Sequence, residues 1–332
     1  MRISRRTALI LGCGPGLSPG SGCGETQRPV GVRGAVTAAT PSTDTFPTVV
    51  RDDLGRRVRI PAAPRRIISL SPSHTECLYA LGVGDHVIAT DSYSDFPPSV
   101  KAKATLTCWP RPPMERIVAL KPDLVVLFTE SSDIVDQLQR LGIPVLKYFP
   151  TSIDGAYRTL RSLGQAVGRQ SGAQSLIAEM QQRLRDLELR LRGAKPRRVM
   201  FELDAMDPAR PFVAGGAGLY GEAMERAGAL NVFGDVHSPA FAVSAEQVLL
   251  KSPEVILLGD SSTPVNPQSP AKVAARPGWG PVPAVRSGWI FPVKSELLTR
   301  ASPRLIDGIR EIARRVHPDR FPTGSPAPTR AR

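Results

Sequence analysis

The stretch between residues 66 and 128 constrains the fold most, because short apolar runs alternate there with helical patterns. An apolar run at 66–70 leads through Ser-Pro-Ser into a helix, a second at 87–91 enters a polar loop, and an amphipathic helix at 114–120 precedes an apolar strand at 124–128. Apolar strands that alternate with helices predict a parallel sheet covered on both faces. Such sheets bind ligands beyond the carboxyl ends of their strands. We therefore expect a ligand site in the segments that follow these strands: Ser71–His74, Tyr93–Asp95 and Cys108–Trp109.

The same alternation resumes after a long helical pattern. From Leu176 to Leu191 an apolar residue recurs every three or four positions, and Gly193 and Pro196 end the pattern. Strands are then predicted at 199–203, 255–259 and 289–293, and helices at 220–228, 245–251 and 303–316. The predicted fold class is α/β, with two Rossmann-like lobes, at 46–168 and 196–322, joined by a single long α-helix at 169–195.

The two ends of the chain predict segments outside these lobes. Residues 1–45 begin with Arg5-Arg6 and a short apolar stretch and continue rich in Gly, Pro, Thr and Ala, which indicates an export signal and a flexible tether. Cys23 is the candidate for lipid attachment, with Cys13 as the alternative. Whether export uses the twin-arginine route stays open. We expect an exported protein, in the periplasm or on the outer face of the cytoplasmic membrane. Residues 323–332 are expected to be a disordered tail.

Charge and cysteine content exclude some partners and leave one question open. The 43 Lys and Arg against 30 Asp and Glu give a net charge of +13, but the positive residues are spread and accompany no nucleic-acid-binding module. No nucleic-acid partner is expected. No apolar run approaches the ~18 residues that span a bilayer. Export allows Cys77 and Cys108 to form a disulfide, while a buried free Cys77 is equally compatible with the sequence.

Motifs for enzymatic chemistry are weak. Gly216–Gly221 matches GxGxxG but does not directly follow a predicted strand, and a GxSxG string at 16–20 falls in the export segment. The histidines show no spacing typical of a metal site. We expect no catalysis, no cofactor and no bound metal, with a nucleotide-binding α/β enzyme as the distant alternative.

The same short sequence pattern, a helix with an early glutamate followed by a buried strand, occurs once in each lobe. Glu115 stands early in a helix that Lys-Pro-Asp ends before a buried strand, and Glu246 stands early in a helix that Lys-Ser-Pro-Glu ends before another. The two lobes therefore look like related halves. Each glutamate is either a carboxylate favoured by the helix dipole or one of two matched acidic points for a partner with two basic sites.

Six stretches carry a resemblance to a known family: SLSPSHTE (69–76), SYSDFPP (92–98), a tryptophan shortly before a glutamate (109–115), ERIVALKPDLVV (115–126), VSAEQVLLKSPEVI (243–256) and RASPRLI (300–306). In this order they resemble the substrate-binding proteins of cobalamin-uptake ABC importers, the BtuF type. The resemblance implies a two-lobed clamp with a rigid helical backbone, which holds one ligand in a cleft and docks as a monomer on a membrane permease dimer. It implies cobalamin or a related corrinoid as the transported ligand.

The resemblance also implies roles for single residues. Tyr93 and Trp109 match cleft aromatics that lie against the corrin, and Glu115 and Glu246 match the lobe-surface glutamates that meet arginines of the permease dimer. The second lobe departs from the family pattern, because residues 295–299 keep an acid, Glu296, without the aromatic residue beside it. This departure keeps haem or a ferric siderophore open as an alternative ligand.

A binding site of this kind needs flat apolar surfaces and a few fixed polar groups. Tyr93, Trp109 and Phe241 are the candidates for the apolar surfaces. His74 is a candidate axial ligand to cobalt or iron, or else a histidine at a helix start that bonds its own backbone. The candidates for the polar groups are Ser71, Ser73, Asp95 and Glu296.

Overall fold

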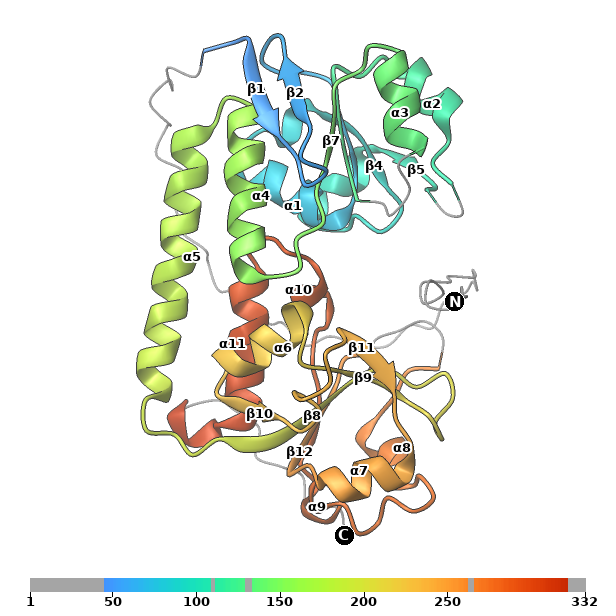
Figure 1. Cartoon of the computed structure of the whole chain (residues 1–332), viewed down its shortest axis with the longest axis vertical. Coiled ribbons are helices and arrows are strands. Elements are labelled where there is room, and N and C mark those ends of the chain that lie inside the picture. The colour runs from blue at the N-terminus through green and yellow to red at the C-terminus, as the bar shows by residue number, and fades with distance from the viewer. Residues whose placement is uncertain (1–44, 109–110, 129–132, 262–265, 322–332) are drawn as a thin grey trace, which may run out of the picture.

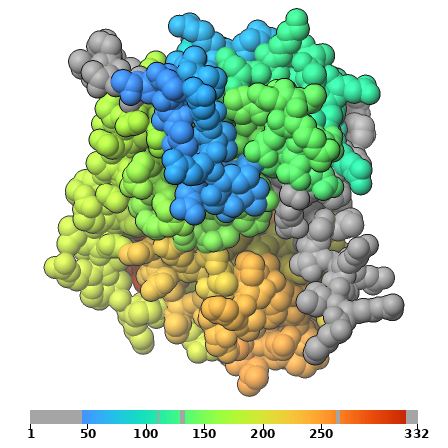
Figure 2. Space-filling view, turned by 45° about the horizontal axis from the view of Figure 1, so that its top comes forward, coloured from blue at the N-terminus to red at the C-terminus, as the bar shows by residue number. Residues whose placement is uncertain are grey.

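The computed structural model describes residues 45–108, 111–128, 133–261 and 266–321. Two α/β lobes are stacked along the long axis of the molecule, and helix α5 (Gln170–Leu191) runs beside both (Figure 1). In the space-filling view the first lobe lies directly on the second, with the yellow-green residues of the helical segment along one side of both (Figure 2). The predicted fold class is confirmed.

The first lobe is built on a five-stranded sheet of order β5-β4-β3-β6-β7, in which every neighbouring pair is parallel. Its central strands, β3 and β6, are buried along their whole length, as their continuous apolar sequences predict. An antiparallel hairpin of β1 and β2 precedes the sheet. The elements are β1 (Thr48–Arg51), β2 (Arg57–Ile60), β3 (Ile67–Leu70), α1 (Pro72–Ala80), η1 (Gly84–His86), β4 (Val87–Asp91), η2 (Pro98–Ala102), β5 (Ala104–Leu106), α2 (Met114–Ala119), β6 (Leu124–Leu127), α3 (Asp133–Arg140), β7 (Val145–Lys147) and α4 (Ile153–Ala166).

The second lobe carries a six-stranded sheet of order β11-β9-β8-β12-β13, with β10 paired to β8. Strands β8, β10, β12 and β13 are parallel, whereas β9 and β11 are antiparallel additions at one edge. The elements are β8 (Arg197–Asp204), β9 (Phe212–Ala214), α6 (Gly218–Arg226), β10 (Ala229–Asn231), β11 (Ala240–Ala242), α7 (Ala245–Lys251), β12 (Val255–Leu258), α8 (Pro270–Ala274), α9 (Pro283–Ser287), β13 (Ile290–Pro292), α10 (Glu296–Thr299), α11 (Leu305–Val316) and η3 (Pro318–Arg320).

The carboxyl edges of the two sheets face each other. The loop that follows β4 contacts Arg300, which lies beyond β13 in the second lobe, through the carbonyl of Tyr93 at 3.3 Å. The start of α4, which follows β7, contacts α6, because the backbone N–H of Ile153 donates to Glu222 at 2.7 Å. A ligand at the carboxyl edge of either sheet would therefore lie between the lobes.

Helix α5 packs against helices of both lobes. Its buried face, which includes Ile177, Met180 and Leu187, contacts α4 of the first lobe and α11 of the second. An ion pair joins Glu188 to Arg226 of α6 at 2.8 Å. Because one continuous helix is packed on both lobes, large rotations of one lobe against the other would require this packing to break.

The junction of α4 and α5 depends on a glycine. A Cβ atom on Gly164 would lie 2.5 Å from the Cβ of Ala173 and 3.0 Å from the carbonyl oxygen of Arg169. Replacement of Gly164 by Ala should therefore lower the free energy of unfolding by about 1–3 kcal/mol, the usual cost of overpacking. Urea denaturation of the purified variant measures this change.

Gly172, in the first turn of α5, provides the matched control. A Cβ atom there meets nothing within 4 Å, so Gly172→Ala should be neutral or stabilise the helix by up to about 1 kcal/mol. Equal effects of the two substitutions would contradict the proposed close contact between α4 and α5.

Candidate functional site

Two phenylalanines stack at the carboxyl edge of the first sheet. Phe128 directly follows β6, and Phe149 follows the neighbouring strand β7. Their ring centroids are 4.4 Å apart at an interplanar angle of 13°, and the residues are 46% and 39% exposed. An exposed aromatic pair on the ligand-binding edge of a parallel sheet offers a flat apolar surface to a ligand.

Neither phenylalanine was among the residues predicted for the site. The sequence placed both at the ends of apolar strands, where burial is the default expectation. The only available signal was an aromatic residue at the last position of each run. That these two residues stack on each other depends on the pairing of β6 with β7, which the sequence does not specify.

The loop that follows β4 carries Tyr93 to the same edge. Tyr93 is half-buried, and its backbone N–H donates to the carboxylate of Asp91 at 3.2 Å. Phe96, further along the loop, is exposed on one face, and the guanidinium carbon of Arg304 lies 3.8 Å from its ring centroid. The loop is thus placed between its own strand and the second lobe.

Asp95 is exposed, and its carboxylate forms an ion pair with Arg300 of the second lobe. Partial burial tends to raise the pKa of Asp95, but the hydrogen bond and charge of Arg300 outweigh burial and leave the pKa below its ordinary value. The acid is therefore ionised at neutral pH. Its position at the edge is compatible with the predicted ligand contact, although the carboxylate already has a cationic partner.

The buried carboxylate of Glu76, on α1, binds three groups of the second lobe. It accepts hydrogen bonds from Arg300 Nη1 at 3.0 Å, Arg304 Nε at 2.9 Å and Ser302 Oγ at 2.6 Å. No role for Glu76 was predicted from the sequence, because its partners lie 224–228 residues away along the chain. These four residues, with Asp95, form the interlobe cluster.

The remaining predicted residues of α1 lie deeper. Ser71 and Ser73 are buried, and their hydroxyl oxygens lie 2.8 Å apart, so each has the other as a partner. His74 has no exposed surface and packs edge-on against Tyr148, with ring centroids 5.8 Å apart. Burial lowers the pKa of His74 to about 3, so the ring is neutral.

This placement corrects both interpretations of His74. An imidazole with no exposed surface does not reach a ligand between the lobes, so the expectation of axial ligation is wrong for this conformation. Neither ring nitrogen has a hydrogen-bond partner within the described residues, so the bond to its own backbone is not formed either. The helical turn directs His74 inward, and the sequence pattern did not reveal this direction.

On the second lobe, Phe241 and Glu296 are half-buried. Phe241 lies in β11 and packs edge-on against the buried Phe233, with ring centroids 5.5 Å apart, so much of its surface serves the core of that lobe. Glu296 begins α10, and its charge adds to burial in raising the pKa of Tyr220. Trp109, the other predicted cleft aromatic, lies outside the described residues.

A second group of buried charges lies at the ends of β8 and β12. Glu202 is fully buried and binds Arg276 through two hydrogen bonds of 2.6 and 2.7 Å, and Arg276 also donates to Gln268 at 2.9 Å. Asp260, just beyond β12, is 2% exposed. Burial raises the pKa of Asp260 from its ordinary value of 3.8 to about 7, and the charge of Glu202 adds to this shift.

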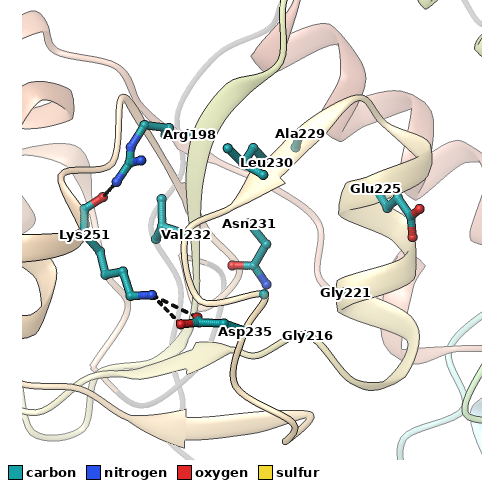
Figure 3. Close-up of a pocket in the computed structure, with 11 residues that line it drawn as sticks. Arg198, Gly216, Gly221, Glu225, Ala229, Leu230, Asn231, Val232, Asp235 and Lys251 are labelled. Atoms are coloured by element: carbon teal, nitrogen blue, oxygen red, sulfur yellow. Dashed lines mark hydrogen bonds and ion pairs between the residues drawn. The ribbon is translucent and has the colours of Figure 1, made fainter.

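A cavity of about 530 Å³ lies elsewhere in the second lobe, between β10, the start of α6 and the end of α7 (Figure 3). Its cationic side chains are engaged: Lys251 Nζ lies 2.8 Å from a carboxylate oxygen of Asp235, and the Arg198 guanidinium donates to the carbonyl of Lys251. The cavity does not adjoin the facing edges of the sheets, so we do not assign the ligand to it.

The glycine motif of the sequence borders this cavity and has a packing role. A Cβ atom on Gly216 would lie 2.1 Å from the carbonyl oxygen of Gly234, and one on Gly221 would lie 2.5 Å from the carbonyl oxygen of Gly216. The motif therefore permits backbone segments to approach closely. This accounts for the pattern without a nucleotide.

Glu115 is exposed in the first turn of α2. The other end of that helix is held by contacts with Arg66, which we call the arginine bracket. Arg66 donates from Nε to the carbonyl of Lys121 at 3.0 Å and from Nη2 to that of Leu120 at 2.6 Å. Asp123 in turn accepts the backbone N–H of Arg66 at 2.9 Å.

The second lobe repeats this bracket at α7, where Glu246 is exposed in the first turn. Arg198 donates from Nε to the carbonyl of Ser252 at 3.3 Å and from Nη2 to that of Lys251. Glu254 accepts the backbone N–H of Arg198 at 2.9 Å. A hydrogen bond with Ser244 lowers the pKa of Glu246, so this carboxylate is charged at neutral pH.

The two helices therefore hold their glutamates in the same way. Both end in a residue of left-handed conformation, Lys121 with φ 47° and Ser252 with φ 41°, followed by a proline. The matched brackets agree with the expectation that the lobes are related halves. They attach the C-terminal ends of both helices to the starts of the central strands β3 and β8.

The cysteines within the described residues are free thiols. Cys77 is buried and Cys108 is half-buried, and neither is in a disulfide. Burial raises the pKa of Cys77. Burial and the charge of Asp91 raise the pKa of Cys108 to about 12. Cys13 and Cys23 lie outside the described residues.

Known proteins share this architecture. The family model described as periplasmic binding protein matches residues 67–297. This chain belongs to the periplasmic binding protein family. Of the helices described in this periplasmic binding protein, none has the length and apolar character to cross a membrane.

Named relatives are similar over most of its length. The vitamin B12-binding protein of Yersinia pestis (strain Pestoides F) is 32% identical over 260 residues, which cover 76% of this chain and 87% of that protein. The Bacillus subtilis (strain 168) protein named uncharacterized ABC transporter substrate-binding lipoprotein YvrC is 28% identical over 289 residues, which cover 85% of this chain and 90% of that protein. The crystal structure of the periplasmic vitamin B12 binding protein BtuF of Vibrio cholerae matches with a TM-score of 0.66 at 24% identity, covering 78% of this chain and 99% of that one, and shows the shared fold.

The pKa of Asp260 predicts a pH dependence of stability. Between about pH 4 and pH 7 the folded protein retains a proton on Asp260 that the unfolded chain has lost, so stability should fall as pH rises through this window. The loss should be at most about 1.4 kcal/mol per pH unit and should end above pH 7, where both states are ionised. Denaturant unfolding of the wild type and of Asp260→Asn at a series of pH values measures it.

The substituted protein is the control, because it lacks the titrating group and keeps a side chain of similar size. The stability of the wild type relative to Asp260→Asn should decline from pH 4 to pH 7. Parallel pH profiles for the two proteins would contradict the raised pKa.

Proposed function

We propose that this protein is the extracytoplasmic substrate-binding component of an ABC importer, that it captures cobalamin or a related corrinoid, and that it delivers this ligand to the permease. The observation that carries the proposal is the exposed stack of Phe128 and Phe149 beside the Tyr93 loop, on the sheet edge that faces the second lobe. The 32% identity to a protein named for vitamin B12 binding supports the ligand class. A capture function requires no catalytic group, and we propose no enzymatic activity and no resident cofactor.

The chemistry of the proposed ligand fits this surface. A corrin is a large macrocycle with extended apolar faces and a polar rim, and flat aromatic side chains bind such faces through dispersion and solvent exclusion. In the proposed site Tyr93, Phe128 and Phe149 lie against the macrocycle from the first lobe, together with Trp109. Phe241 is proposed to supply a further apolar surface from the second lobe. Asp95, Ser71 and Ser73 on the first lobe and Glu296 on the second are proposed to contact the rim.

Export and anchoring follow from the proposed role. A binding protein for an importer acts outside the cytoplasmic membrane, and its N-terminal 45 residues fit an export signal and tether. The lipoprotein name of the Bacillus relative supports lipid attachment, for which Cys23 is our candidate. We propose a monomer that docks on a permease dimer through Glu115 and Glu246.

Calorimetric titration of the protein from residue 45 onward with cyanocobalamin, cobinamide and haemin tests the ligand class. We expect sub-micromolar binding of at least one corrinoid. Phe128→Ala and Phe149→Ala should each weaken that binding by about 1–3 kcal/mol, as expected for aromatic anchors. Leu189→Ala is the control, because Leu189 is also an exposed apolar residue, on α5 and away from the facing edges.

The outcomes of this titration separate the alternatives. Binding of haemin without either corrinoid would keep the transport role and replace the ligand. Unchanged affinity in both phenylalanine variants would remove the stack from the site. No binding of any of the three compounds would refute the proposed ligand class altogether.

Charge reversal tests the docking assignment separately. Glu115→Arg combined with Glu246→Arg should leave corrinoid affinity unchanged and abolish uptake, because surface charge steers and orients association. Uptake of labelled cyanocobalamin by cells that carry each variant in place of the wild-type gene measures the effect. Glu179→Arg combined with Asp186→Arg is the matched control, because it reverses two exposed acids of α5 and gives the same net charge.

Normal uptake by the double docking variant would contradict the assignment of these glutamates. Loss of uptake in the α5 control would attribute the effect to net charge. Loss of corrinoid affinity in the docking variant would place the two glutamates in the ligand site.

A further inference from the structure

We propose that Arg300 is a positioning residue of the ligand site: from the second lobe it fixes the Tyr93 loop of the first, so that ligand contact by Tyr93 depends on how the lobes are placed. The inference rests on the proposed function, in which Tyr93 touches the ligand. It concerns a different residue, on the opposite lobe, that does not need to touch the ligand itself.

The contacts of Arg300 carry this inference. Its Nη2 donates to the carbonyl of Tyr93 at 3.3 Å, its Nη1 donates to Glu76 at 3.0 Å, and the same guanidinium pairs with Asp95. One planar group therefore joins the loop backbone, a loop side chain and α1. Arginine suits this task because its donors lie in a rigid fork.

The two ends of the loop are held by different lobes. Near its start, the backbone N–H of Tyr93 and the hydroxyl of Ser94 donate to Asp91, and Ser94 also lies 2.9 Å from the hydroxyl of Thr75. These contacts belong to the first lobe. Beyond Tyr93, Asp95 pairs with Arg300 and Phe96 lies under Arg304, and both arginines belong to the second lobe.

A displacement of the second lobe would therefore reach the ligand site through this loop. Arg300 lies between α10 and α11 and moves with that lobe. If the lobes separate, the guanidinium leaves the carbonyl of Tyr93 and the carboxylate of Asp95, and the loop loses the restraint that fixes its second half. Restrained loops bind more tightly than free ones, because the ligand does not have to order them.

Removal of Arg300 leaves the buried acid paired, which makes the test practical. Glu76 keeps the hydrogen bonds from Arg304 and Ser302, and Asp95 is exposed enough to be solvated. Arg300→Gln is therefore expected to fold, whereas removal of Glu76 would leave two arginines without their shared partner.

The experiment is a double-mutant cycle on corrinoid affinity. Arg300→Gln, Tyr93→Ala and the double variant are titrated with cyanocobalamin in the calorimeter, and their melting temperatures are compared. We expect each single substitution to weaken binding about fivefold to tenfold, and the double variant to bind no more than about twofold more weakly than Tyr93→Ala alone. Arg300→Lys, which keeps the charge and loses the fork, should restore part of the affinity.

Glu222→Ala, which removes an acceptor shared between the lobes, provides the control for interlobe contacts in general. Glu222 joins the lobes through the N–H of Ile153, away from the Tyr93 loop. This substitution should leave the affinity for cyanocobalamin unchanged in both the wild-type and the Tyr93→Ala backgrounds.

Each result decides the proposal. Wild-type affinity in Arg300→Gln overturns it, as does wild-type affinity in Tyr93→Ala. Independent, additive losses overturn it as well, because they would mean that Arg300 acts on the site without Tyr93. Failure of the wild type to bind cyanocobalamin, cobinamide or haemin overturns the proposed function, and this inference falls with it. Binding by the wild type with an unaffected Arg300→Gln overturns this inference alone.

Discussion

The relative placement of the two lobes depends on the buried carboxylate of Glu76. A carboxylate taken out of water destabilises a fold by several kcal/mol unless close partners compensate it. Arg300, Arg304 and Ser302 supply those partners, and all three belong to the other lobe. Folding of the first lobe therefore leaves a charge that only the docked second lobe satisfies. This requirement fixes the residues around the cluster, including the Tyr93 loop, at the point where the sheets face each other.

Helix α5 and the contacts at the ends of α2 and α7 also hold the parts of the molecule in place. Helix α5 packs on α4 and α11, so each lobe is held by the same rigid element. At the far ends of α2 and α7, Arg66 and Arg198 repeat one bracket, in which an arginine binds the last helical carbonyls. The frame thus spaces two exposed acids as well as two facing sheets. The two exposed acids and the two facing sheets are therefore held in a single arrangement.

The sequence predicted those parts of the fold that local patterns determine. Strands β6 and β12 are continuous apolar runs, and β3 and the centre of β8 are mainly apolar. These strands and the long helices fell close to their predicted positions. The three-residue strands β5, β9, β10 and β11 were missed, because so short a run has no measurable period. The site was predicted less completely. Tyr93 and Asp95 lie at the expected edge, but the inward direction of His74 and the stacking of Phe128 on Phe149 arise from tertiary packing.

Charge at the facing edges favours a particular kind of ligand. Arg300 and Arg304 are paired with Glu76 and Asp95, and Arg276 is paired with Glu202. A small anionic ligand would have to compete with these carboxylates for the arginines, at a large cost in desolvated charge. A large macrocycle with apolar faces can instead use the aromatic surface that the edge already exposes. Because the arginines at these edges are already paired with carboxylates, Arg300 and Arg304 across the lobes and Arg276 within the second lobe, the proposed recognition depends on shape and apolar area. The proposed corrinoid, with its neutral amide rim, meets that condition better than a ligand that relies on carboxylates.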